Sequence, residues 1–173
     1  MPDLKLATFA GGCFWCMQPP FQNEPGVLEV LAGYTGGQGR DPNYDDYISK
    51  GHTEAVQLKY DPAKVSYERL LEIFWQSINP TDADGQFADR GPGYYAGIYT
   101  HEGEQRKAAE KSKKDLDASG KFDMPILTPI HAAGSFYPAE KYHQDYSKKN
   151  PAHYNAYKTG SGRAGFLKQY WKH

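Results

Sequence analysis

The chain has 173 residues and a formal net charge of -1, from 20 basic and 21 acidic side chains. This length suits one domain with its own hydrophobic core, and we predict a single domain over residues 1–173. The balanced charge argues against nucleic acid or an anionic membrane as a partner, and no run reaches the roughly 18 apolar residues of a membrane helix. Because Met1–Lys5 carries no apolar leader, we expect a soluble cytoplasmic protein, with a monomer as the default.

The predicted elements of the first hundred residues alternate between strands and helices. In chain order they are a strand over Leu4–Ala10, a helix over Phe14–Gln22, strands over Val27–Tyr34 and Thr53–Tyr60, a helix over Tyr67–Ile78 and a strand over Tyr94–Thr100. Ser66 can cap the second helix, and Asn79-Pro80 ends it. The order β-α-β-β-α-β is typical of the ferredoxin-like, or split βαβ, arrangement.

The last third of the chain is predicted less completely. We expect a charged helix over Glu102–Ser119, a short strand near Ile126–Ile130 and a helix near Ala139–Ser147. From Asn150 onward the sequence indicates no element, so we expect a long coil. The predicted fold class is therefore α+β: a two-layer sandwich with a ferredoxin-like core, C-terminal helices and a coil tail.

Cys13 and Cys16 are the only cysteines, and a Gly11-Gly12 turn leads into them from the first strand. A cysteine at a helix N-terminus meets unpaired backbone N–H groups and the helix dipole, and both favour the reactive thiolate. So short a loop would add little stability as a structural disulfide. The pair therefore indicates redox chemistry in a reducing compartment.

Other interpretations of the pair stay open at this point. A zinc site needs about four ligands, and there is no second cysteine pair, although six histidines leave mixed ligation possible. A thioredoxin-like dithiol suits the preceding strand, and two inert core cysteines are also common. Phe14 and Trp15 between the cysteines either fill the core or form the wall of a pocket. An apolar aromatic wall would suit a methyl thioether.

Glu54 is the second candidate for chemistry. Strand alternation puts it on the same face as Val56 and Leu58, although a residue so near the strand start could also reach solvent. If Glu54 is buried, desolvation raises its pKa and makes it a proton donor near neutral pH. A carboxylic acid near a thiolate is well suited to the reduction of an oxidised sulfur.

Seven motifs occur in one order along nearly the whole chain. They are Gly-Gly-Cys-Phe-Trp-Cys at 11–16, Gly-Tyr-Thr-Gly-Gly at 33–37, Asp-Pro-x-Tyr at 41–44, Gly-His-x-Glu-Ala-Val at 51–56, Tyr-Asp-Pro at 60–62, Phe-Ala-Asp-Arg-Gly-Pro-x-Tyr at 87–94 and Tyr-His-Gln-x-Tyr at 142–146. In these motifs the chain resembles the A-type peptide-methionine sulfoxide reductases. The resemblance implies an oxidoreductase that repairs proteins after oxidative stress by reducing the S epimer of methionine sulfoxide.

The resemblance also implies a role for each matching residue. Cys13 is the expected nucleophile, Glu54 the proton donor, Tyr44 and Tyr94 the hydroxyls that hold the sulfoxide oxygen, Phe14 and Trp15 the pocket for the substrate methyl group, and Asp89 a polar residue of the site. Simpler interpretations exist for three of them. Tyr44 could anchor its loop, Tyr94 could be an ordinary strand aromatic, and Asp89 could be a turn residue.

Two departures from the family pattern bear on the mechanism. Gly93 and Tyr95 stand where many relatives carry Gln and Arg, and the C-terminal tail lacks the cysteines that many relatives use for recycling. Cys16 is then the only candidate to resolve a Cys13 sulfenic acid into a Cys13–Cys16 disulfide, which external thioredoxin would reduce, with no bound cofactor or metal. Helical Cβ atoms three residues apart lie about 5–6 Å apart, whereas a disulfide needs about 3.5–4.5 Å. The first turn must therefore distort.

Overall fold

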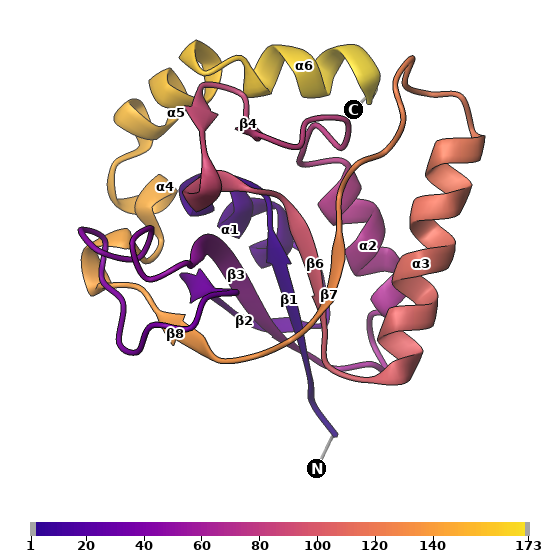
Figure 1. Cartoon of the computed structure of the whole chain (residues 1–173), viewed down its shortest axis with the longest axis horizontal. Helices are drawn as coiled ribbons and strands as arrows, with labels where there is room; N and C mark the ends of the chain where they lie inside the picture. Colours follow the sequence, from indigo (N-terminus) through magenta and orange to yellow (C-terminus); the bar gives the residue numbers. More distant parts are fainter. Residues whose placement is uncertain (1–2, 172–173) are drawn as a thin grey trace.

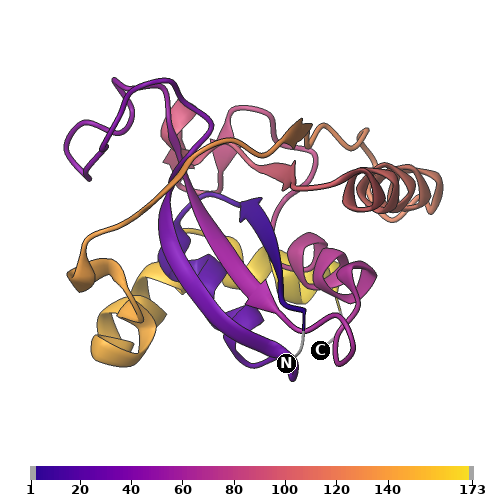
Figure 2. The ribbon, with the colours of Figure 1, turned by 90° about the horizontal axis from the view of Figure 1, so that it is seen from below.

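A six-stranded sheet forms the centre of the fold in the computed structural model, which describes residues 3–171 (Figure 1). Its strand order is β7-β6-β1-β3-β2-β8. The bounds are β1 (Lys5–Ala10), β2 (Val27–Thr35), β3 (Thr53–Tyr60), β6 (Gly97–Thr100), β7 (Ile130–Ala132) and β8 (Phe136–Pro138), and a separate two-stranded sheet pairs β4 (Gly85–Gln86) with β5 (Asp89–Arg90). Only β6 and β7 pair in parallel among the sheet's neighbours. The sheet is strongly curled (Figure 2).

The core lies where two helices cover one face of this sheet. Phe9 of β1 stacks on Phe21 of α1 (Phe14–Gln22) at 5.2 Å and on Phe74 of α2 (Tyr67–Trp75) at 5.1 Å between ring centroids. Ser66 caps α2 as predicted, because its side chain accepts a hydrogen bond from the backbone N–H of Arg69. This packing fixes β1, and with it the turn that carries the cysteines.

The remaining helices follow the sheet core. They are α3 (Gly103–Ala118), α4 (Tyr146–Lys149), α5 (Pro151–Gly160) and α6 (Arg163–Tyr170), with 3-10 turns at Pro92–Tyr94 and Lys141–His143. In Figure 1, α3 lies on one side of the molecule, and α5 and α6 run along another. None of the helices within residues 3–171 is both long and apolar enough to cross a membrane.

The C-terminal tail corrects one prediction, because it forms α5 and α6 rather than a coil. Pro151 begins α5 at the position where proline is tolerated, and Gly162 separates the two helices in the left-handed region at φ 93°. Both helices are mostly polar, and each buries a single side chain deeply, Tyr154 and Arg163. With one buried residue each, the two helices have no clear apolar face that would predict them from the sequence. Tertiary contacts stabilise these helices instead.

Smaller differences concern the ends of predicted elements. The chain from Pro92 to Tyr94 is a 3-10 turn, so the predicted strand begins only at Gly97. In place of the helix expected near Ala139–Ser147, the chain forms the 3-10 turn at Lys141–His143 and then, after Asp145 with its φ of 55°, the short helix α4. Strand β7 starts at the last residue of the predicted strand, since the backbone N–H of Leu127 instead donates to Pro80. The mixed α+β class is confirmed.

Candidate active site

The turn between β1 and α1 places Cys13 at the start of a helix. Gly12 has φ +85°, and a side chain there would come within 2.6 Å of Gln86 Cβ, so glycine is required at this position. Cys13 follows as the N-cap residue of α1 and is 6% exposed. The predicted position at a helix mouth is therefore observed, but the thiol is buried.

A small cavity of about 70 Å³ lies beside Cys13. Its lining consists of Cys13, Phe14, Trp15, Tyr44, Glu54, Asp89, Tyr94 and Tyr157. Seven of the eight predicted site residues thus meet around one space, although they come from five separate segments of the chain. Cys16 is the exception, because it lies outside the lining and packs against Cys13 and Tyr154. Tyr157 is an addition that the sequence did not indicate.

Glu54 is 1% exposed, which decides between the two positions that strand alternation left open. One carboxyl oxygen accepts a hydrogen bond of 3.0 Å from the backbone N–H of Phe14, and the other accepts one of 2.8 Å from the Tyr47 hydroxyl. Burial raises the pKa of Glu54 to about 8 in spite of these two hydrogen bonds. The side chain is therefore a protonated acid at neutral pH.

The two thiols share one site but differ in their protonation. Burial, the hydrogen bond with Cys16 and the nearby Glu54 raise the pKa of Cys13 well above its ordinary value. The hydrogen bond with Cys13 lowers the pKa of Cys16 to about 7. The dipole effect expected at Cys13 is thus outweighed, because desolvation in the closed turn penalises its thiolate. Because the two thiols interact directly, these pKa values belong to the pair rather than to either thiol alone.

Two tyrosine side chains line the cavity from different segments. Tyr44 lies in the segment between β2 and β3, where its backbone N–H donates to Glu140 at 3.1 Å. Tyr94 ends the 3-10 turn before β6. Burial raises the pKa of both phenols, so both are hydrogen-bond donors at neutral pH. Both side chains line the cavity, and their role in holding a substrate oxygen stays a prediction.

The aromatic wall is held by a segment far along the chain. Trp15 stacks on Tyr146 at 3.8 Å, and its Nε1 donates to His143 Nδ1 at 3.1 Å. The Gln144 side chain fixes this segment to β2, because it exchanges hydrogen bonds of 2.9 and 2.8 Å with the backbone of Ala32. His143, Gln144 and Tyr146 belong to the Tyr-His-Gln-x-Tyr motif at 142–146, for which the sequence predicts no role.

Asp89 is joined to the tail by a hydrogen bond from the Tyr157 hydroxyl of α5. Burial raises the pKa of the Asp89 carboxyl. Tyr157 completes the cavity wall from a segment that we expected to be coil, so no pattern in the sequence could have identified it. Among residues 3–171, no three His, Cys, Asp or Glu side chains gather as a possible metal site.

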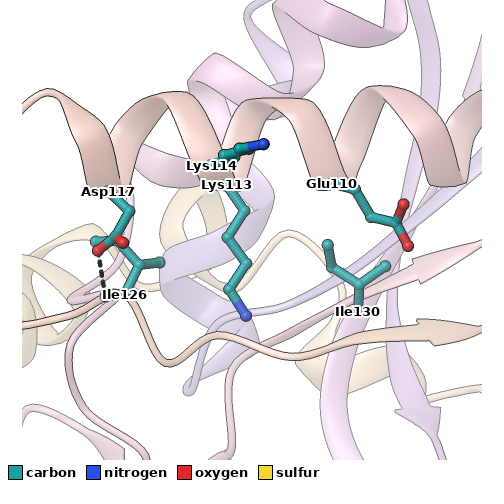
Figure 3. Close-up of a pocket in the computed structure, with 6 residues that line it drawn as sticks. All are labelled: Glu110, Lys113, Lys114, Asp117, Ile126 and Ile130. Atoms are coloured by element: carbon teal, nitrogen blue, oxygen red, sulfur yellow. Dashed lines mark hydrogen bonds between the residues drawn. The ribbon is translucent and has the colours of Figure 1, made fainter.

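A second hollow lies far from this chemistry. It is an open groove of about 380 Å³ beside α3 (Figure 3). Its lining is Glu110, Lys113, Lys114, Asp117, Ile126 and Ile130. Lys113 extends into the groove between the two isoleucines (Figure 3). No predicted site residue contributes to it.

The small cavity defines the class of protein. A thiol and a protonated carboxylic acid line the same enclosed space, and a second thiol lies behind the first. This pairing allows nucleophilic attack by sulfur together with proton donation, which is the chemistry of a thiol-dependent reductase.

Comparison with known proteins identifies the family. A sequence model of the family described as peptide methionine sulfoxide reductase matches residues 5–173. The chain therefore belongs to the peptide methionine sulfoxide reductase family, and the resemblance drawn from the seven motifs is confirmed. Membership favours a methionine sulfoxide reductase over the thioredoxin-like oxidoreductase that the cysteine pair alone left open.

Relatives and solved structures agree with this assignment. Peptide methionine sulfoxide reductase MsrA of Bacillus licheniformis is 57% identical over 169 residues, which cover 96% of this chain and 93% of the relative. The reduced form of Mxr1 from Saccharomyces cerevisiae has a TM-score of 0.80 at 28% identity and covers 86% of this chain and 87% of its own. Methionine sulfoxide reductase A of Corynebacterium diphtheriae has a TM-score of 0.75 at 30% identity, over 87% of this chain and 77% of its own.

Proposed function

We propose that this chain reduces the S epimer of methionine sulfoxide, free or within proteins, to methionine. Family membership supports the reaction class. One observation carries the assignment of residues: the protonated acid Glu54 and the thiol of Cys13 line the same cavity of about 70 Å³. Such a space admits only a small group. We assign the methyl group to the wall formed by Phe14 and Trp15, and the oxygen to Tyr44, Tyr94 and Glu54.

In the first step, the dithiol carries one negative charge, and Cys13 becomes the thiolate by passing its proton to the neighbouring Cys16 sulfur. The Cys13 thiolate then attacks the sulfoxide sulfur while Glu54 protonates the oxygen. The sulfur–oxygen bond of the substrate breaks, the oxygen passes to Cys13 as a sulfenic acid, and methionine leaves with its sulfur reduced by two electrons. Asp89, which accepts the hydrogen bond from Tyr157, supplies a further polar contact in the cavity.

In the second step, the Cys16 sulfur attacks the Cys13 sulfenic acid. A sulfur–sulfur bond forms, the sulfur–oxygen bond breaks, and the hydroxyl leaves as water with the Cys16 proton. Cys16 is well placed for this role, because it is buried directly against Cys13. An external dithiol, for which we propose thioredoxin, then reduces the disulfide. A solved structure of Saccharomyces cerevisiae Mxr1 is described as a complex with Trx2.

We further propose that the core is ferredoxin-like. The antiparallel order β6-β1-β3-β2 supports this description, since the two crossovers through α1 and α2 then make two interlocked split βαβ units. A monomeric cytoplasmic enzyme that carries no bound cofactor remains our working proposal.

The test is to trap the intermediate. Cys16→Ser protein is mixed with each epimer of methionine sulfoxide, and Cys13 is examined by mass spectrometry after addition of a sulfenic-acid reagent. We expect a Cys13 sulfenic acid and one equivalent of methionine with the S epimer, and a Cys13–Cys16 disulfide in the wild-type protein. Absence of both products from the variant would end the proposal, and a wild-type protein without the disulfide would remove the role of Cys16.

A further inference from the structure

Arg163, the first residue of α6, is a buried cation next to the site. It is 2% exposed. Its guanidinium donates hydrogen bonds to two backbone carbonyls, that of Gly11 at 2.8 Å and that of Ser77 at 2.5 Å. The ring of Phe87 lies 4.7 Å from its Cζ. All of these partners are neutral.

No carboxylate within residues 3–171 pairs directly with this cation, although from a longer distance its charge opposes the rise in the pKa of Asp89 that burial causes. None of the ion pairs formed within residues 3–171 includes Arg163. A buried guanidinium without an anion is unfavourable, and carbonyl dipoles compensate it only in part. Such a group is retained either because it holds the fold together or because an anion forms nearby during the reaction.

Its position indicates which anion that is. The guanidinium bonds to Gly11, two residues before Cys13, and a Cβ built on Gly12 would lie 3.0 Å from its Nη2. The charge thus sits directly behind the turn that presents the nucleophile. The hydrogen bond with Cys13 makes the largest contribution to the lowered pKa of Cys16. The charge of Arg163 lowers this pKa as well, whereas burial raises it. The charge of Arg163 also opposes the rise of the Cys13 pKa.

We propose that Arg163 is a positioning residue of the dithiol: its charge stabilises the single thiolate shared by Cys13 and Cys16, and its hydrogen bonds hold the turn that carries Cys13. The proposal rests on the proposed function, in which that thiolate is the attacking group. When the disulfide forms, the negative charge of the thiolate disappears and its favourable interaction with the cation is lost. Arg163 therefore also favours the reduced dithiol, which makes the disulfide easier for thioredoxin to reduce.

The experiment compares charge variants in the reduced protein without substrate. Arg163→Met replaces the cation with an apolar side chain of similar length, and Arg163→Gln is a second neutral variant. Arg163→Lys restores the charge. Lys168→Gln, an exposed position in the same helix, removes one positive charge elsewhere. The readouts are the pH titration of thiolate absorbance, the rate of alkylation at neutral pH, and the equilibrium with glutathione.

We expect both neutral variants to titrate at higher pH and to be alkylated about tenfold more slowly at neutral pH. Their disulfide should be harder to reduce, Arg163→Lys should recover most of the difference, and Lys168→Gln should match the wild type. Folded neutral variants with an unchanged titration would overturn the proposal. Loss of folding in both would also overturn it, because a structural role would then explain the burial.

The result of the thiol titration can be judged independently of the proposed function. The titration uses no methionine sulfoxide, so it decides the role of Arg163 whichever substrate the site accepts. If wild-type protein releases no methionine from the sulfoxide, the proposed function fails while the titration still stands.

Discussion

Two hollows of this protein, the groove beside α3 and the cavity at Cys13, differ in what surrounds them as well as in their size. The groove beside α3 holds about 380 Å³, and the cavity at Cys13 about 70 Å³. In the groove, Glu110 and Lys114 are exposed to water, and Arg106 pairs with Glu110 at the surface. In the cavity, Glu54 and Cys13 are buried, and burial shifts the pKa of each. Chemistry depends here on desolvation, since charges interact strongly only where water is excluded.

Among the variants that test this difference between the cavity and the groove, Glu54→Gln should have the largest effect on activity. The amide is nearly the same shape but cannot donate the proton, so we expect kcat/KM for methionine sulfoxide to fall by about 10²-fold or more. Exchange of the Cys13–Cys16 pair with a small disulfide should stay nearly intact. If sulfoxide reduction survives the substitution, a thioredoxin-like dithiol would explain the site and the acid would be structural.

The pH dependence of kcat/KM tests the burial of Glu54 and the two thiols, and its expected effect is smaller. The dithiol must lose a proton, and the pKa of Cys16 is about 7, so the rate should rise as the pH rises through that value. Glu54 must keep its proton, and its pKa is about 8, so the rate should fall as the pH rises further. We expect a bell-shaped kcat/KM profile with its maximum between these values. In Glu54→Gln the fall on the alkaline side should vanish.

Lys113→Gln gives the smallest expected effect. Lys113 lies in the larger hollow, but its partners there are apolar or exposed to water. We expect less than about a twofold change in kcat/KM and a change in unfolding free energy within about 0.5 kcal/mol. Steady-state kinetics and urea denaturation measure both. A large loss of activity would mean that the groove takes part in the reaction and that the comparison is wrong.

Much of the site could be predicted because its signals are local. The Gly11-Gly12 turn, the cysteines after it and the place of Glu54 in an alternating strand each depend on a few adjacent residues. The cap at Ser66 is of the same kind. The tail escaped prediction, because α5 and α6 are polar helices that depend on contacts with distant segments. Tyr157 and Arg163 could therefore not be assigned to the site from their own neighbourhood in the chain.

The sequence by itself determined the family, the cysteine pair at the first turn and seven of the residues that line the cavity, since these are carried by motifs of fixed spacing. It did not determine the protonation of those residues. Burial of Glu54, the shifted pKa values of the two thiols and the cation behind the turn all arise when segments distant in the chain exclude water from one another. A pKa depends on that three-dimensional environment, and only the tertiary structure supplies it.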